Sequence, residues 1–272
     1  MLAREAAGAF DDPAFLFEVK WDGYRALLER DGRGHVHLWG RSGRDLGGDL
    51  PDLRAGLGEE LRRPCLLDGE VVALRDGRSD MTRLRARREP LVYMAFDLLR
   101  WDGGDLLELP LRERRARLGA VPAGPRLVRS EGVVGSGRAY FRGIAARALE
   151  GMMAKDLRAP YRPGVRSRTW LKVLNALEER LAVVAAEAGA PGRIAALWLA
   201  DGEGRPAVRV AGIPAGDAAA VVARLHRHRD PAAPGTVWPV APGLLCRVRH
   251  RGRTDGGPPR HPVYAGLEEE AP

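Results

Sequence analysis

The sequence predicts an α+β protein with two domains. Short apolar runs alternate with Asp-Gly and Gly-rich turns along much of the 272 residues, a pattern typical of strands. Only a few segments space their leucines as a helix does. Near residue 176 the pattern changes to short strands around a single helix. We therefore expect a first domain over 1–176 and a second over 177–272.

In the first domain the strands follow from local turn signals. "FLFEVKW" and "YRALLER" flank Asp22-Gly23, so we expect two strands joined by that turn. "CLLDGEVVAL" is expected to form a pair of strands around Asp68-Gly69. "LVYMAFDLL" predicts one buried strand. Three helices are predicted, over residues 48–61, "PLRERRARL" and "GRAYFRGIAARALE", the second because a helix tolerates proline at its start.

The second domain predicts a small barrel. "ERLAVVAAEAG", "RIAALWLADGEGRPAVRVAGI", "LLCRVRH" and "HPVYAG" suit short antiparallel strands, and one helix is expected at about 216–228. Several short strands with one helix fit a barrel such as an OB-fold. His226 and His228 lie on that helix, where a surface role is favoured because nothing completes a set of metal ligands.

Composition restricts the class of protein. Hydrophobic residues make up 45% and charged residues 29%, as in a soluble globular protein, and no apolar run is long enough to span a bilayer. The first residues lack the apolar stretch of a signal peptide, so we expect a cytoplasmic protein. Cys65 and Cys246 lie far apart in apolar contexts and are expected to be buried thiols.

The net charge of +8 suits a polyanionic partner such as nucleic acid, although a solvated basic surface would have the same charge. The choice of basic residues is unusual: lysine occurs only at Lys20, Lys155 and Lys172, and every other basic residue except histidine is arginine. A guanidinium stays protonated and cannot act as an amine nucleophile. Lys20, in an apolar strand before a tight turn, is therefore a candidate for amine chemistry, with Asp22 placed to orient it. The alternative is an edge-strand lysine that faces water.

The residues around Lys20 resemble a family signature. "KWDGYR" is similar to the Lys-x-Asp-Gly-x-Arg motif of nucleotidyltransferases that adenylate or guanylate their own lysine, namely ATP-dependent DNA ligases, RNA ligases and mRNA capping enzymes. The other motifs of the series follow in order in "WGRSGRDL", "LDGEVV", "AFDLL" and "LEGMMAKDLRAPYRPGVRSRTWLKV". The matching residues are Arg41, Glu70, Phe96, Glu150, Lys155, Arg166, Trp170 and Lys172.

Nearly the whole chain resembles the bacterial ligases of non-homologous end joining, most closely in "FDDPAFLFEVKWDGYRA", "EGMMAKDLRAPYRPGVRSRTWLKV" and "RHPVYAGL". In that family the catalytic core stands alone or is fused to a polymerase and a nuclease, neither of which we expect in this sequence. The resemblance implies an adenylation domain of antiparallel sheets with flanking helices, followed by an OB domain. It also implies an ATP-dependent DNA ligase of bacterial DNA repair.

The resemblance assigns roles to individual residues. Lys20 would attack the α-phosphate of ATP and hold AMP, which passes to the 5′-phosphate at a nick before the 3′-hydroxyl seals the strand. Glu18 would read the adenine edge, Phe96 would stack on the base, and Arg25 would reach the ribose. Arg41 would bind the DNA 5′-phosphate or the AMP phosphate. Arg166 and Lys172 would face the nucleotide phosphates, and Lys155 would be a further pocket residue. Glu70 and Glu150 would bind Mg²⁺ or Mn²⁺, or Glu70 would instead hold a ribose hydroxyl.

Each of these residues also has an ordinary reading: Phe96 as core, Trp170 as packing, and Glu70 and Glu150 as solvated carboxylates. Their order and spacing together favour the functional site.

Two motifs depart from the family pattern. Leu174 stands where a second lysine normally follows Lys172, and Glu268 and Ala271 stand where a C-terminal Arg-x-Asp-Lys motif has its arginine and lysine. Carboxylates there would oppose the ATP triphosphate. Either Arg253 or Arg260 substitutes, or self-adenylation is slow while pre-adenylated nicks are still sealed, or the first step is lost and the protein mainly binds.

Three functions stay open. We expect a monomeric bacterial ligase associated with the nucleoid, bound to nicked or broken double-stranded DNA. The resemblance implies the end-binding protein Ku as a partner, although no residue specifies it. The alternatives are an RNA ligase or capping-type guanylyltransferase, against which Glu18 and "RHPVYAGL" argue, and a nucleic-acid-binding module with impaired self-adenylation. Steep salt dependence without nucleotidyl transfer would indicate the last of these.

Overall fold

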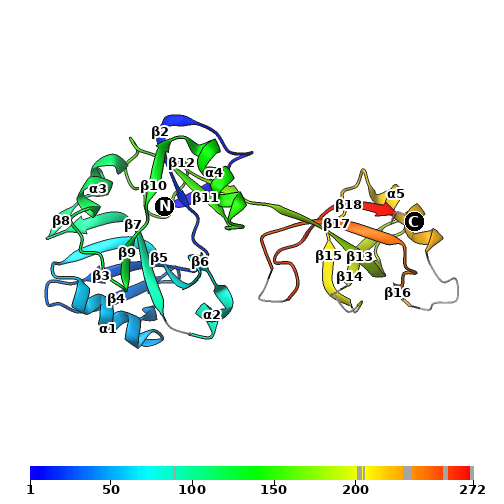
Figure 1. Ribbon diagram of the computed structural model, residues 1–272, viewed down its shortest axis with the longest axis horizontal. Coiled ribbons are helices and arrows are strands. Elements are labelled where there is room, and N and C mark those ends of the chain that lie inside the picture. Colours follow the sequence, from blue (N-terminus) through cyan, green and yellow to red (C-terminus); the bar gives the residue numbers. More distant parts are fainter. Residues whose placement is uncertain (88–89, 201–203, 205, 229–234, 254–256, 270–272) are drawn as a thin grey trace. The chain divides into compact units, whose positions relative to one another are not determined.

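The computed structural model describes residues 1–87, 90–200, 204, 206–228, 235–253 and 257–269 (Figure 1). The chain divides into two compact units, Met1–Asn175 and Ala176–Pro272. In the described residues no helix combines the length and the apolar character needed to cross a membrane.

The strands of the first unit that the structure describes form two mixed sheets (Figure 1). The smaller has the order β1-β12-β11-β2-β10, with bounds Leu2–Glu5, Arg166–Leu174, Gly151–Asp156, Asp12–Val19 and Gly132–Gly135. The larger has the order β4-β3-β5-β7-β8, with bounds Val36–Gly40, Tyr24–Arg30, Cys65–Arg75, Leu91–Trp101 and Gly104–Asp105. In addition β6 (Arg78–Ser79) pairs with β5, and β9 (Leu127–Arg129) pairs with β7.

Most neighbouring strands are antiparallel, as expected, but β1 pairs with β12 and β7 pairs with β9 in parallel. For these two pairs the expectation of antiparallel sheets is wrong. Helices accompany the sheets, with bounds η1 Leu46–Gly48, α1 Pro51–Glu60, α2 Met81–Arg85, α3 Leu111–Leu118 and α4 Gly137–Ala146.

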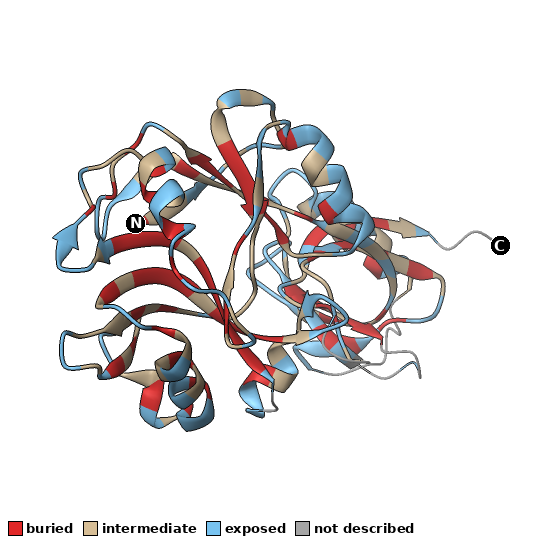
Figure 2. Cartoon of the chain, turned by 60° about the vertical axis from the view of Figure 1, so that its left-hand side comes forward, coloured by how far each residue is buried: buried red, intermediate tan, exposed pale blue. Residues whose placement is uncertain are grey.

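Buried side chains concentrate along the strands, whereas the helices present exposed faces (Figure 2). The leucine spacing of the first predicted helix is confirmed in α1, where Leu53 and Leu57 are fully buried. This helix begins at Pro51 because proline fits the first turn. Against the smaller sheet, α4 packs Ile144 into a core cluster with Phe17 and Met152. These two helices thus bury apolar side chains against the sheets.

The prediction that two strands are joined as a hairpin at Asp22-Gly23 is wrong. β2 belongs to the smaller sheet and β3 to the larger, so residues 20–23 cross from one sheet to the other. The turn signal is real, but its cause is a close approach: a Cβ on Gly23 would lie 2.1 Å from the Val71 carbonyl oxygen. The crossing holds Lys20 between two sheets.

The strand pair expected around Asp68-Gly69 is also wrong, because β5 runs unbroken from Cys65 to Arg75. Its pairing with β7 shifts register between Asp68 and Gly69. A Cβ on Gly69 would lie 2.4 Å from the Tyr93 ring, so this glycine makes room for a buried tyrosine. The predicted strand over 91–99 is confirmed in β7.

The second unit is built on one antiparallel sheet of order β15-β14-β13-β17-β18, with β16 also paired to β13. The bounds are β13 Leu177–Ala188, β14 Ile194–Ala200, β15 Pro206–Ala211, α5 Ala218–Arg227, β16 Val237–Pro239, β17 Leu244–His250 and β18 Val263–Glu269. The end strands β15 and β18 contact each other. Cys65 in the first unit and Cys246 in the second are both free and buried, as expected.

Candidate active site

Strand alternation brings the polar motif residues of the smaller sheet to one face. Side chains two residues apart along a strand point to the same side. The strands β2, β11 and β12 are neighbours in the smaller sheet. Each contributes two such side chains to a common cavity, β2 together with the residue that follows it. The pairs are Glu18 and Lys20, Met153 and Lys155, and Trp170 and Lys172.

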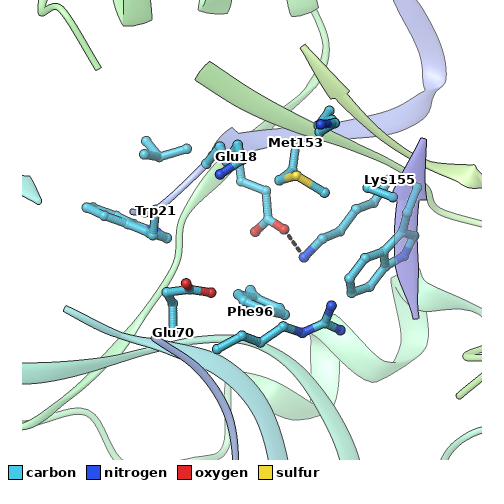
Figure 3. A pocket seen from close by; sticks show the side chains of 12 residues that line it. Glu18, Trp21, Glu70, Phe96, Met153 and Lys155 are labelled. Atoms are coloured by element: carbon cyan, nitrogen blue, oxygen red, sulfur yellow. Dashed lines mark ion pairs between the residues drawn. The ribbon is translucent and has the colours of Figure 1, made fainter. Parts of the chain in front are cut away.

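The larger sheet supplies the opposite wall. Arg25 on β3, Glu70 on β5 and Phe96 on β7 line the same cavity, which has a volume of about 170 Å³. Figure 3 shows Glu18 and Lys155 pointing at each other across this space, with Phe96 and Glu70 nearby. The sequence motifs therefore meet in space because the two sheets face each other at this point.

Lys20 is positioned by the pairing of β2 with β11. Its backbone N–H donates to the Gly151 carbonyl at 2.9 Å, which extends the strand ladder one residue beyond Val19. That register sets Lys20 beside Glu150, and Lys20 Nζ donates to Glu150 Oε1 at 2.8 Å. The Lys20 side chain is 24% exposed, so the amine lies in the cavity and is still reachable.

Glu150 accepts a hydrogen bond from Lys20, and Glu70 is electrostatically coupled to both of these residues. Glu150 Oε2 is buried and accepts no hydrogen bond in the described part of the chain. Burial raises the pKa of Glu70 to about 8; the charges of Lys20 and Arg25 oppose this rise, and that of Glu150 adds to it. An orphaned buried oxygen beside a second, electrostatically coupled carboxylate fits a divalent cation, which takes hard oxygen ligands.

Glu18 is buried and paired with two cations. Lys155 Nζ forms an ion pair with Glu18 Oε1, and Arg115 Nη1 lies 3.6 Å from Glu18 Oε2. The Lys155 ammonium also lies 4.0 Å from the centroid of the Phe96 ring and 4.3 Å from that of Trp170. Burial lowers the pKa of Lys155, against the opposing charge of Glu18. This cluster forms the aromatic end of the cavity.

Arg25 is fixed in its place by Asp68. Its guanidinium donates through Nε at 3.0 Å and Nη2 at 2.7 Å to the two carboxylate oxygens, and the buried Tyr161 hydroxyl donates to the same carboxylate at 2.8 Å. Arg25 also lies over the rings of Phe96 and Trp170, 5.8 and 5.6 Å from their centroids. A forked ion pair of this kind leaves Arg25 little freedom to move.

Other predicted residues lie near the cavity or outside it. Arg41 is exposed and lines a neighbouring groove of about 670 Å³, which shares Arg25 and Glu70 with the cavity. Lys172 Nζ pairs with Glu5 at 3.0 Å. Arg166 is exposed, donates to the Ala3 carbonyl and is not a lining residue of the cavity, and Asp22 is not one either.

The residues proposed to compensate at the C-terminus belong to the second unit. Arg253 pairs with Glu179, and the Arg260 backbone N–H donates to the Gly252 carbonyl at 2.8 Å. Glu268 pairs with Arg180 and Arg247, each at 3.1 Å. Ala271 lies outside the described residues.

Sequence reasoning missed several residues of the site. Trp21 lines the cavity beside Lys20, and Met153 lies two residues before Lys155, so strand alternation could have found it. Asp68 and Arg115 carried no such signal. Their importance depends on pairing with residues at least 43 positions away, Arg25 and Glu18.

The chain matches the family of the ATP dependent DNA ligase domain over residues 1–173 and belongs to that family. The resemblance noted in the sequence is thereby confirmed. The chain is 34% identical over 307 residues to the multifunctional non-homologous end joining protein LigD of Pseudomonas aeruginosa. This alignment covers 100% of this chain and 36% of that protein. It is also 37% identical over 211 residues to a probable DNA ligase of Anaeromyxobacter sp., covering 70% of this chain and 40% of that protein.

Two solved structures are similar over the full fold. A mycobacterial DNA ligase D complexed with ATP and MES aligns with a TM-score of 0.62 at 29% identity, covering 100% of this chain and 95% of that one. The ligase domain of LigD from M. tuberculosis aligns with a TM-score of 0.63 at 29% identity, covering 98% and 94%. The chain thus spans 40% or less of the two curated relatives and nearly all of these two solved chains.

Proposed function

We propose that this chain is an ATP-dependent DNA ligase that seals nicks between a 5′-phosphate and a 3′-hydroxyl through a lysyl-AMP intermediate. The observation that carries the proposal is the position of Lys20 Nζ, in a cavity lined by Phe96, Glu70 and Lys172 and 2.8 Å from Glu150. A side-chain amine in a cation-rich and aromatic cavity suits covalent capture of a nucleotide.

In the proposed reaction, Lys20 Nζ attacks the α-phosphate of ATP, and pyrophosphate leaves. Glu150, which already accepts a hydrogen bond from this amine, is placed to orient it and to take up its proton. AMP then passes to the 5′-phosphate of a nick, and the 3′-hydroxyl displaces AMP. Each step moves a phosphoryl group, so positioning and charge neutralisation carry the catalysis.

The other residues take the roles expected from the family. Phe96 stacks on the base, Glu18 accepts from the adenine amine, and Arg25 reaches the ribose from its fixed place on Asp68. Lys172 meets the nucleotide phosphates from the cavity wall, with Lys155 as a further pocket residue. Arg41, in the adjoining groove, meets the DNA 5′-phosphate or the AMP phosphate.

Three of the proposed assignments concern residues that do not line the cavity. Arg166 remains a proposed phosphate contact although it does not line the cavity, and Asp22 remains a proposed orienting residue for the amine. Arg253 or Arg260 is proposed to substitute for the missing cations at the triphosphate.

Glu70 and Glu150 are the proposed ligands of Mg²⁺ or Mn²⁺. A divalent cation bound there would neutralise phosphate charge during transfer. The unsatisfied Glu150 Oε2 and the raised pKa of Glu70 favour this proposal, because a cation would satisfy the first and stabilise the ionised form of the second.

The second unit is proposed to be an OB domain beginning at residue 177, after an adenylation domain over 1–176. The support is the order of its strands together with the contact between the end strands β15 and β18, which suits a closed or nearly closed barrel. β13 pairs with β17 along its first half and with β14 along its second, as a strand that turns a barrel corner does.

A second candidate is a ligase that seals pre-adenylated nicks better than it adenylates itself. Leu174 replaces a family lysine, and Glu268 is already engaged by Arg180 and Arg247, so neither position offers a cation to the triphosphate. This candidate retains the same cavity and the same final step.

The test is incubation with α-labelled ATP or GTP and Mg²⁺ or Mn²⁺, followed by a nicked DNA duplex. We expect a label from ATP on Lys20, its transfer to the nick and a sealed product. Lys20→Arg keeps the cation but removes the nucleophile, so it should abolish labelling. Sealing of pre-adenylated nicks without any labelling would favour the second candidate, and labelling by GTP alone would indicate a capping-type enzyme. A nick with RNA on its 3′-hydroxyl strand separates DNA from RNA ligation.

The biological setting is proposed on the similarity to the end joining proteins. We propose action in bacterial DNA repair at the nucleoid, as a monomer on nicked or broken double-stranded DNA, with Ku as a candidate partner. A pull-down with purified Ku in the presence and absence of DNA ends tests the last point.

A further inference from the structure

Arg115 ties together the residues that surround the proposed base site. From α3, its Nη1 donates to the Phe96 carbonyl at 3.2 Å and its Nη2 donates to the Ser130 carbonyl at 2.6 Å. The same Nη1 lies 3.6 Å from Glu18 Oε2. Phe96 lies on β7 of the larger sheet and Glu18 on β2 of the smaller sheet, so one guanidinium links the two walls of the cavity.

The link extends to a third wall residue. The Ser130 hydroxyl accepts from Trp21 Nε1 at 3.0 Å, and Trp21 lines the cavity next to Lys20. Ser130 is itself buried, and its backbone N–H donates to the Ala95 carbonyl at 2.7 Å, next to Phe96. Arg115 therefore holds a small, largely buried network that includes an aromatic residue, a carboxylate and the segment that crosses between the sheets.

Arg115 also places a positive charge beside the buried Glu18 carboxylate. Glu18 is 1% exposed, and a buried carboxylate is costly unless groups of opposite charge lie beside it. Lys155 occupies one oxygen and Arg115 faces the other. An ionised carboxylate accepts hydrogen bonds and donates none, so it favours the amine of adenine over the carbonyl oxygen that guanine carries at the same place.

We propose that Arg115 is a specificity-determining positioning residue: it orients Glu18 against the Phe96 ring and pairs with its carboxylate, so that the site selects adenine over guanine. This inference rests on the proposed nucleotide site. Arg115 acts through Glu18 and the wall spacing and is not itself a catalytic residue.

The test measures equilibrium binding of ATP and GTP to the full chain without divalent metal, so that no covalent transfer occurs. The variants are Arg115→Met, which removes the positive charge and the forked hydrogen-bond donors of the guanidinium, and Arg115→Lys, which keeps the charge. Arg117→Met is the matched control, because Arg117 is an exposed arginine on the same helix that pairs with Glu113. We expect Arg115→Met to weaken ATP binding about tenfold and the ATP-over-GTP ratio by a similar factor, with Arg115→Lys between it and the wild type.

A double-mutant cycle with Glu18→Gln separates positioning from general damage. If Arg115 acts through Glu18, then Arg115→Met lowers the ATP-over-GTP ratio much less in the Glu18→Gln background. Equal losses for ATP and GTP, or an unchanged ratio while the wild type discriminates, would overturn the inference and leave the proposed function intact. Wild-type protein that binds neither nucleotide would overturn both. Arg115→Lys keeps the test decisive where the methionine variant fails to fold.

Discussion

Replacing Glu70 by glutamine should change the pH dependence of stability. Burial raises the pKa of Glu70 from 4.5 to about 8, with Lys20 and Arg25 opposing the rise. The folded protein therefore keeps a proton that the unfolded chain releases between these two values. Since the folded state binds more protons there, the free energy of unfolding contributed by this group falls as pH rises from 4.5 to 8.

The size of the effect follows from the same numbers. A difference of about 3.5 pH units at about 1.4 kcal/mol each gives a ceiling of about 5 kcal/mol. Glu70 borders a cavity open to water, so partial solvation of the ionised form reduces the expected effect to about 2 kcal/mol. Glu70→Gln removes this titration and should gain that much stability over the wild type between pH 5 and pH 9.

The measurement is urea denaturation at pH 5, 7 and 9 for the wild type, Glu70→Gln and the control Glu113→Gln, whose carboxylate is exposed on α3. The Glu70→Gln advantage should grow with pH while the control difference stays flat. A constant difference within about 0.5 kcal/mol across this range would refute the assignment of a costly buried charge to Glu70. Mn²⁺ should remove the advantage by stabilising the ionised wild-type carboxylate.

Three further changes test other parts of the structure. Asp97→Asn breaks a fully buried, forked ion pair with Arg114, so urea denaturation should show a loss of about 3–5 kcal/mol, and a loss below 1 kcal/mol contradicts this. Gly23→Ala places a Cβ 2.1 Å from the Val71 carbonyl oxygen and displaces the segment carrying Lys20, so lysyl-AMP formation should fall about 100-fold; an unchanged rate contradicts the close approach. Glu268→Arg restores a cation expected by the family and should speed self-adenylation about tenfold in a single-turnover assay, whereas no gain contradicts the charge argument.

The sequence indicated several residues that line the cavity, but it did not indicate how the chain brings them together. Motif order indicated Lys20, Glu70, Phe96, Glu150 and Lys172, and alternation along strands explains why Lys20 and Lys172 share a face with Glu18 and Lys155. The Asp22-Gly23 signal, however, gave a hairpin where the chain crosses between sheets. A turn residue reports local backbone freedom and does not report which sheet the next strand joins.

Long-range pairs escaped prediction for a different reason. Arg114 and Arg115 are adjacent arginines in an arginine-rich helix, yet the first is fully buried on Asp97 and the second reaches Glu18. Helical periodicity places such residues on neighbouring faces but cannot identify partners on other strands. Only the packing of α3 against β7 separates them from exposed neighbours such as Arg117.

For Lys155 and Lys20, the pKa of the amine and its access to the cavity favour different residues as the proposed nucleophile. Lys155 has a pKa lowered by burial, which taken alone would favour it as the reactive amine. Its ammonium, however, is paired with Glu18, lies against the rings of Phe96 and Trp170, and belongs to a side chain that is only 1% exposed. Lys20 is 24% exposed beside a carboxylate that can take its proton. Peptide mapping of the labelled protein should therefore find AMP on Lys20 in the wild type and in Lys155→Met; AMP on Lys155 would show that reactivity follows the pKa of the amine and not its access.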